Sequence, residues 1–278
     1  MKAREIISYL LPHVVTAGAY SAQIQKRVAV HDAKDGDTPF HHALSDADLT
    51  IQAYLEVALL ARFPEINYYS EEQASSLNKQ YFLGTSELEV LLDPVDGTRP
   101  YIDGREYYQV IVTIHDAKEI VGAIAYLPRR DFAFVATRGD GAYKVTTEEM
   151  LQGKPGVKLD VTKACGPLQT FNAKELVARL RPSFEIIDHV QAYVENPGTY
   201  YSTDLLEGKA SGVVHRSCQA IDGGALGFIA TEAGAVMTDF HGKPLRSFRE
   251  FENRTIPEVV VAANREVHQA ILDALAHR

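Results

Sequence analysis

The chain of 278 residues has little cysteine and no tryptophan. Its two cysteines, Cys165 and Cys218, are far apart in the sequence and belong to no C-x-x-C pattern. A disulfide framework and a zinc knuckle are therefore excluded, and we expect the protein in a reducing cytoplasm. The 19 glycines and 12 prolines are too few for a fibrous or low-complexity chain.

Long apolar runs and blocks of positive charge are missing as well. No segment reaches the roughly 20 apolar residues that a membrane-spanning helix needs, and Glu5 and Pro12 interrupt the apolar stretch near the start, unlike a secretory signal. Lys and Arg number 28 against 37 Asp and Glu, which gives a net charge of −9. We therefore expect neither a nucleic-acid polymer nor a membrane as partner. Cation binding is one explanation of the acidic excess, and ordinary surface charge is the other.

The composition is that of a globular protein, with 46% hydrophobic and 23% charged residues. No repeat or linker divides the chain. We expect one compact unit with an α+β half over residues 1–155 and an α/β half over residues 156–278. Apolar periodicity predicts the following elements: helices over 3–28, 47–62 and 265–275, a buried strand over 88–92, an antiparallel meander over 109–115, 120–127 and 132–137, and short strands over 213–214, 236–240 and 259–262.

The strongest local signal is the motif DPVDGT at residues 93–98. Asp93 and Asp96 flank a proline at the end of an apolar strand, where two carboxylates repel each other unless a cation lies between them. Gly97 permits a close approach by a ligand or by backbone. Thr98 is placed to cap a short helix, whose free N–H groups favour a phosphate.

Two further acidic positions lie outside this motif. Glu71 follows a short aromatic segment that can form a strand, and Asp222 precedes an apolar helical run. Each residue alone is more often a helix cap or a surface residue than a ligand. Together with the motif, they form a set of hard oxygen donors without nearby Cys or His, which suits Mg²⁺ or Mn²⁺ and not zinc.

The order of the motifs resembles that of the inositol monophosphatase superfamily, whose members are Mg²⁺-dependent, lithium-sensitive phosphatases. The resemblance rests on five ordered elements: Ser45-x-x-Asp48, Phe63-Pro64, Glu71-Glu72, DPVDGT and an Asp222 helix that ends in TEAGA. It implies a layered αβαβα sandwich of the α+β or α/β class. The first half would hold an antiparallel sheet and the second a mainly parallel or mixed sheet. It also implies a homodimer that acts on a small phosphorylated metabolite.

The resemblance further implies which residues hold two or three metal ions. Glu71, Asp93 and the main-chain carbonyl of Val95 would hold one Mg²⁺. Asp93, Asp96 and Asp222 would hold a second, and a weaker third would use Glu71 and water. Two such metals bind both the attacking water and the leaving oxygen, which lowers the pKa of the water and stabilises an in-line transition state.

Phosphate binding and water activation are implied for neighbouring residues. Gly97 and Thr98 would offer backbone N–H groups to the phosphate. Thr98 would pair with Asp48 and, together with Glu71, orient and deprotonate the attacking water. These assignments make Asp48, Glu71 and Thr98 the candidate catalytic residues.

The substrate is less well defined than the chemistry. His215 and Arg216 occupy the region where inositol-selective members carry a Glu that contacts a substrate hydroxyl, and Asp222 would also line this site. The change puts inositol 1-phosphate in doubt and favours a substrate with a second anionic group; packing at a strand end is the competing explanation. We expect a sugar, polyol or nucleotide phosphate. A 3′(2′),5′-bisphosphate nucleotidase and a fructose-1,6-bisphosphatase are the alternatives.

Two other classes of protein are alternatives. Asp46-Ala47-Asp48-Leu49-Thr50 spells the D-x-D-x-T of haloacid-dehalogenase-type phosphatases, but the residues before it are not an apolar strand and those after it have helical periodicity. A non-catalytic metal- or phosphate-binding protein would be expected to lose a ligand or the threonine. This sequence keeps them all.

Overall fold

The computed structural model describes residues 2–28, 44–196, 198, 201–245, 247 and 250–276. The chain divides into two compact units. Met1–Thr137 and Lys144–Val157 form unit 1, and Arg138–Tyr143 and Lys158–Arg278 form unit 2.

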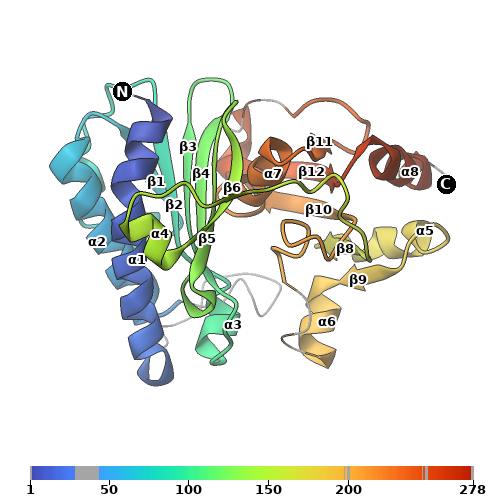
Figure 1. Cartoon of the computed structure of the whole chain (residues 1–278), viewed down its shortest axis with the longest axis horizontal. Helices are drawn as coiled ribbons and strands as arrows, with labels where there is room; N and C mark the ends of the chain where they lie inside the picture. The colour runs from blue at the N-terminus through green and yellow to red at the C-terminus, as the bar shows by residue number, and fades with distance from the viewer. Residues whose placement is uncertain are drawn as a thin grey trace. The chain divides into compact units, whose positions relative to one another are not determined.

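Two long helices pack against the sheet of unit 1 (Figure 1). Helix α1 (Ala3–Ile24) continues into the 3₁₀ turn η1 (Gln25–Arg27), and α2 spans Asp46–Arg62. Both predicted helices are confirmed. Apolar residues at helical spacing on each helix are buried, among them Ile6, Leu10 and Val14 on α1, and this face packs against α2 and β4.

The sheet of unit 1 has the strand order β1-β2-β3-β4-β5-β6-β7. Its strands are β1 (Asn67–Ser70), β2 (Glu89–Asp96), β3 (Gln109–His115), β4 (Ile120–Leu127), β5 (Phe132–Thr137), β6 (Gly141–Thr146) and β7 (Val157–Lys158). Strands β1 and β2 are parallel, and β2 to β5 pair in antiparallel fashion. The predicted meander is confirmed. The predicted strand over 88–92 runs on to Asp96, with an irregular register between Asp93 and Asp96.

Short helical segments connect these strands. They are η2 (Gln73–Ser75), η3 (Lys79–Tyr81), α3 (Thr98–Ile102), η4 (Pro128–Arg130) and α4 (Thr147–Leu151). Every residue of β3 is buried, so the strand lies in the middle of unit 1 and anchors its neighbour β2. The residues that follow β2 therefore begin from a rigid part of the sheet.

Unit 2 holds a five-stranded sheet with the order β11-β12-β10-β8-β9. Its strands are β8 (Leu168–Phe171), β9 (Ile186–Asp188), β10 (Gly212–Gln219), β11 (Val236–Thr238) and β12 (Thr255–Ala262). Strands β8, β9 and β10 are parallel, whereas β12 is antiparallel to both β10 and β11. The sheet is therefore mixed. An α+β class with a mostly antiparallel first sheet and a mixed second sheet is confirmed.

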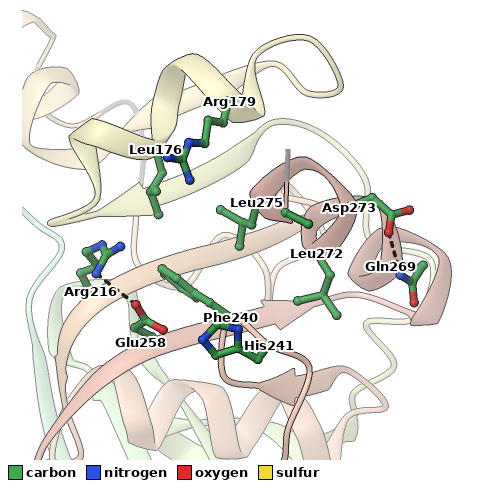
Figure 2. A pocket seen from close by; sticks show the side chains of 11 residues that line it. Leu176, Arg179, Arg216, Phe240, His241, Glu258, Gln269, Leu272, Asp273 and Leu275 are labelled. Atoms are coloured by element: carbon green, nitrogen blue, oxygen red, sulfur yellow. Dashed lines mark hydrogen bonds and ion pairs between the residues drawn. The ribbon is translucent and has the colours of Figure 1, made fainter. Parts of the chain in front are cut away.

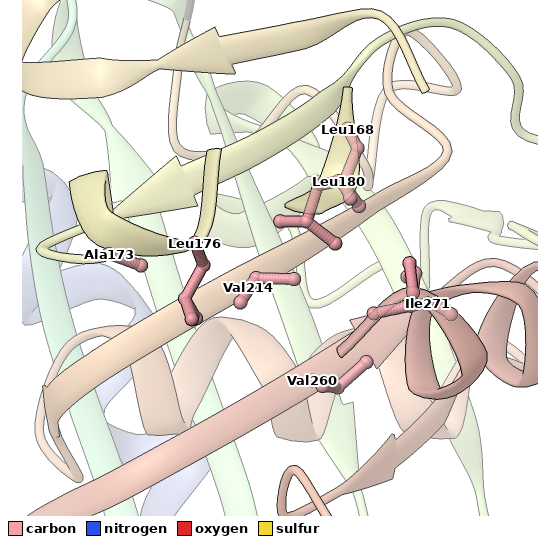
Figure 3. Close-up of a cluster of buried hydrophobic side chains, with 9 residues drawn as sticks. Leu168, Ala173, Leu176, Leu180, Val214, Val260 and Ile271 are labelled. Carbon is pink, nitrogen blue, oxygen red and sulfur yellow. The ribbon is translucent and has the colours of Figure 1, made fainter. Parts of the chain in front are cut away.

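The two faces of this sheet carry different helices. Its helical segments are η5 (Lys174–Leu176), α5 (Val177–Leu180), α6 (His189–Glu195), α7 (Gly223–Glu232), η7 (Glu252–Arg254) and α8 (Arg265–Ala276). On one face Val214 and Val260 form a core with Leu180 of α5 and Ile271 of α8 (Figure 3). Side chains alternate along a strand, so Val261 lies on the other face, where Gly227 of α7 packs against it.

Candidate active site

The motif DPVDGT forms the end of β2 and the start of α3. Gly97 is the N-cap of α3 with a φ of 85°, a left-handed conformation that favours glycine. The sequence predicts Thr98 as the cap of this helix, but Thr98 is the first residue of the helix. Its hydroxyl donates to the carbonyl of Val95 at 2.9 Å, and the N–H of Val95 donates to Oδ1 of Asp93 at 3.1 Å. These bonds fix the turn.

Asp48 and Thr98 meet although 50 residues separate them. Asp48 is the third residue of α2 and closes a capping box, in which the Ser45 N–H and hydroxyl donate to its Oδ2 at 2.9 and 2.6 Å. Its Oδ1 lies 3.2 Å from Oγ1 of Thr98. A hydroxyl carries one proton. The Thr98 hydroxyl can thus donate to Val95 or to Asp48, and it can accept a hydrogen bond from protonated Asp48 while it donates to Val95.

Glu71 lies beside this pair. It follows β1 directly, and its N–H donates to the carbonyl of Leu92 at 3.0 Å. Because β1 and β2 are parallel, their carboxyl ends meet at one edge of the sheet, which brings Glu71 next to the start of the DPVDGT turn. The negative charge of Glu71 contributes to the raised pKa of both Asp48 and Asp96, so it lies near both carboxylates.

Burial perturbs two of these acids. Desolvation, with the charge of Glu71 as a smaller cause, raises the pKa of Asp48 to about 7, and the Ser45 hydroxyl opposes the shift. Desolvation and the Glu71 charge likewise raise the pKa of Asp96 to about 7, against the hydrogen bond from Gln109 Nε2 at 2.7 Å. The edge of unit 1 therefore concentrates negative charge that is partly withdrawn from water.

The donors at this edge suit a hard divalent cation. Glu71, Asp93 and Asp96 offer carboxylate oxygens and Val95 a carbonyl, and Mg²⁺ prefers oxygen ligands of this kind. In the ranges that the structure describes, however, no three His, Cys, Asp or Glu side chains are grouped as a metal site. The chemistry of the residues fits the ion, and their ligation stays a prediction.

The remaining predicted residues belong to unit 2. Asp222 is the N-cap of α7 and accepts a hydrogen bond from the N–H of Gly223. His215 on β10 lies against the same helix start, because a Cβ on Gly223 would be 3.4 Å from its Cδ2. The structure thus brings Asp222 and His215 to one end of α7. Its position relative to the residues of unit 1 stays a prediction.

His215 is part of an aromatic stack that the sequence did not reveal. The Phe171 ring stacks on His215 with centroids 5.1 Å apart and on His189 with centroids 3.8 Å apart. Burial lowers the pKa of His215 to about 4 and that of His189 to about 3, and for His189 the neighbouring His215 adds to the effect. Both rings are therefore neutral at pH 7. Phe171 is the last residue of β8, His189 directly follows β9, and His215 lies opposite Phe171 on β10. Only the register of the strands shows that these residues meet.

Arg216 lies on the opposite face of β10. It forms ion pairs with Glu175 and, at 3.1 Å, with Glu258, and its guanidinium lies over the ring of Phe240 at 5.2 Å. Arg216, Glu258 and Phe240 line a pocket of about 640 Å³ that α5 and α8 also border (Figure 2). Adjacent residues of a strand point to opposite faces, so His215 and Arg216 cannot contact the same small ligand directly. A substrate contact of His215 would therefore belong to the face of α7, and one of Arg216 to the face of the pocket; both stay predictions.

The family model of the inositol monophosphatase family matches residues 8–278. The chain belongs to this family, whose members are phosphatases, and it is a phosphoric monoester hydrolase. None of the helices within the described ranges is both long and apolar enough to cross a membrane.

Individual relatives differ in the activity their names give. The chain is 27% identical over 217 residues to a glucose-1-phosphate thymidylyltransferase of Streptomyces griseus, and the match covers 77% of each chain. It is 24% identical to a histidinol-phosphatase of Chlorobaculum parvum, with 76% of each chain covered. Among solved structures, an IMPase/NADP phosphatase complexed with Mg²⁺ and phosphate has a TM-score of 0.73 at 17% identity and covers 99% of this chain and 97% of its own. At this identity the likeness shows the fold.

Proposed function

We propose that this chain hydrolyses a small organic phosphate monoester by attack of water, with Mg²⁺ as cofactor. The observation that carries the proposal is the contact between Thr98 Oγ1 and Asp48 Oδ1 with Glu71 beside it, at the edge where DPVDGT begins. The Thr98 hydroxyl is hydrogen-bonded to a carboxylate of raised pKa, so it can pass a proton from water to Asp48.

In the proposed reaction, Glu71 and the Thr98 hydroxyl orient the attacking water. Its proton passes to Glu71 or, through Thr98, to Asp48, whose raised pKa makes it a better base at neutral pH than an ordinary aspartate. The N–H groups of Gly97 and Thr98 bind the phosphate oxygens. When bound, Mg²⁺ supplies positive charge that lowers the pKa of a water molecule and offsets the repulsion between the acidic edge and the phosphate.

The proposed metal ligands follow the family pattern. Glu71, Asp93 and the Val95 carbonyl would hold one Mg²⁺, and Asp93, Asp96 and Asp222 would hold a second. A third, weaker ion would use Glu71 and water. Mn²⁺ has the same preference for oxygen ligands. The burial of Asp93 and the raised pKa of Asp96 support the proposal, because bound cations would favour the ionised forms of these two acids.

The substrate proposal is a sugar, polyol or nucleotide phosphate. The neutral aromatic surface of His215, Phe171 and His189 beside Asp222 favours a planar group over a polyol such as inositol. This keeps a 3′(2′),5′-bisphosphate nucleotidase as the second candidate and makes a fructose-1,6-bisphosphatase less favoured. We also propose a cytoplasmic homodimer that is inhibited by lithium, as the family resemblance implies.

Phosphate release from a substrate panel tests the proposal. The panel holds inositol 1-phosphate, histidinol phosphate, 3′-phosphoadenosine 5′-phosphate and fructose 1,6-bisphosphate, each with Mg²⁺, with Mg²⁺ and lithium, and with EDTA. We expect Mg²⁺-dependent release that EDTA abolishes. Glu71→Gln should lose it, whereas Glu106→Gln, which changes an exposed surface acid, should keep it. No release from any substrate by the wild type would favour a non-catalytic binding protein.

A further inference from the structure

Helix α2 carries a stripe of buried polar side chains. Asp48, Gln52 and Glu56 recur at every fourth residue and expose 0%, 2% and 0% of their surface. Residues four apart lie on the same side of a helix. Burying an amide or a carboxylate costs free energy unless hydrogen bonds replace those to water. Their partners therefore indicate what the stripe does, and only Asp48 belongs to the proposed catalytic residues.

Gln52 and Glu56 form hydrogen bonds to residues 71–78, the part of the chain that begins with Glu71. We call these residues the acidic segment. Gln52 Nε2 donates to the main-chain carbonyl of Glu72 at 3.1 Å. One oxygen of Glu56 accepts from the Ser76 hydroxyl at 2.5 Å, and the other accepts from Asn78 Nδ2 at 3.0 Å. Both ends of the segment are thus tied to α2.

The acidic segment has little regular structure of its own. It contains the 3₁₀ turn η2, in which Ser75 N–H donates to the Glu72 carbonyl at 3.0 Å and Ser76 N–H to the Gln73 carbonyl at 3.4 Å. Such bonds three residues apart have poorer geometry than those of an α-helix and do not hold a long segment in place. The bonds from α2 supply the long-range restraint.

Glu71 lies between two restrained parts of the chain. On its N-terminal side the chain is paired to β2, through the bond from its N–H to Leu92, and on its C-terminal side the Glu72 carbonyl is held by Gln52. The same helix holds Asp48 against Thr98. One helix therefore restrains both proposed proton acceptors, Glu71 and Asp48.

We propose that Gln52 and Glu56 are positioning residues, which hold the acidic segment against α2 so that the Glu71 carboxylate faces Asp48 and Thr98. The inference rests on the proposed function of Glu71. Residues that orient a ligating or catalytic group typically change metal affinity or activity by 10- to 100-fold when they are altered.

The variant Glu56→Gln tests the proposal because it keeps the side-chain shape. When its amide oxygen accepts from Ser76, its NH₂ group faces the NH₂ group of Asn78, and two donors oppose each other; when the amide is reversed, the Ser76 hydroxyl loses its acceptor. Either orientation weakens one of the two bonds. We expect kcat about tenfold lower with KM within about twofold, and Mn²⁺ bound about tenfold more weakly in an electron paramagnetic resonance titration. Trypsin should cut faster after the exposed Lys79 in EDTA.

A rescue and a control separate positioning from stability. In Glu56→Gln/Asn78→Asp the donor and acceptor exchange places, and we expect Mn²⁺ affinity and kcat to return to within about threefold of the wild type. Leu59→Ala removes buried apolar atoms from the same helix. It should lower Tm but leave kcat and Mn²⁺ affinity within about twofold. Should Glu56→Gln fail to fold, Asn78→Ala is the second variant. It removes the hydrogen bond to Oε2 of Glu56 and should weaken Mn²⁺ binding by about threefold.

The proposal is overturned if Glu56→Gln, or Asn78→Ala in its place, changes Tm without changing Mn²⁺ affinity or kcat, as Leu59→Ala should. It is also overturned if the exchanged pair does not recover. If the wild type releases no phosphate from any substrate, the proposed function fails, whereas the Mn²⁺ titration and the tryptic cleavage rate still decide whether α2 positions the segment.

Discussion

Replacing Asp48 by asparagine should stabilise the metal-free protein at high pH while it strongly lowers kcat. The asparagine oxygen can accept from Ser45, and its NH₂ group can donate to the Thr98 hydroxyl, which then donates to Val95. No buried polar group loses its partner. The substitution thus removes the buried charge and little else.

The magnitude follows from the pKa of Asp48. Burial raises the folded-state pKa from 3.8 to about 7, so between these values the folded protein binds a proton that the unfolded chain has lost. Stability from this group is fully present below pH 3.8, falls as the pH rises and is lost above about pH 7. At about 1.4 kcal/mol per unit the loss from pH 5 to pH 8 is about 3 kcal/mol. Asparagine does not titrate and avoids this loss.

Urea unfolding in EDTA at pH 5 and pH 8 measures the effect. The difference in unfolding free energy between Asp48→Asn and the wild type should shift in favour of the variant by about 3 kcal/mol between the two pH values, because contributions from groups that do not interact with Asp48 cancel. With Mg²⁺ present, kcat should fall by about 10²- to 10⁴-fold, since the amide cannot accept a proton. A stability difference that is equal at both pH values would refute the reasoning.

Three further perturbations give separate tests. Thr98→Ala should lower kcat about 100-fold with little change in KM, while Thr98→Ser should keep most activity; a change confined to KM would count against its role at the water. Asp93→Asn should abolish Mg²⁺-dependent phosphate release with Tm in EDTA unchanged or raised, and full activity would rule out the ligand assignment. Burial lowers the pKa of His189 to about 3, so its stability contribution is fully present above pH 6.5 and is lost progressively as the pH falls from 6.5 toward 3. His189→Phe should therefore flatten the fall of stability between pH 6.5 and 4, and an unchanged slope in urea unfolding would contradict the pKa.

Local patterns in the sequence predict the elements whose cause is local. The meander over 109–137 alternates β-rich runs with short polar turns, and helix α2 has an apolar face and a capping residue, so both were predictable within a residue or two. The sequence does not predict strands β6, β7, β8 and β9. They are short, and their pairing depends on partners far along the chain, which local periodicity does not report.

The same distinction holds at the candidate site. The DPVDGT turn and its glycine follow from the motif, because a left-handed residue is needed at Gly97. Helical spacing also predicts that Gln52 and Glu56 lie on the same side of α2 as Asp48. It does not predict which groups they bind. The stack of Phe171 on His189 and His215 and the opposite facing of Arg216 arise from strand register. No pattern within one segment encodes these contacts.

The central claim is that water activated by Glu71, Thr98 and Asp48 attacks phosphorus directly. The stereochemical course at phosphorus tests it, with a substrate whose phosphate is chiral through oxygen isotopes. One in-line displacement by water predicts inversion. Retention would indicate two displacements through a phosphorylated residue, as on Asp46 in the haloacid-dehalogenase alternative, and would contradict the account.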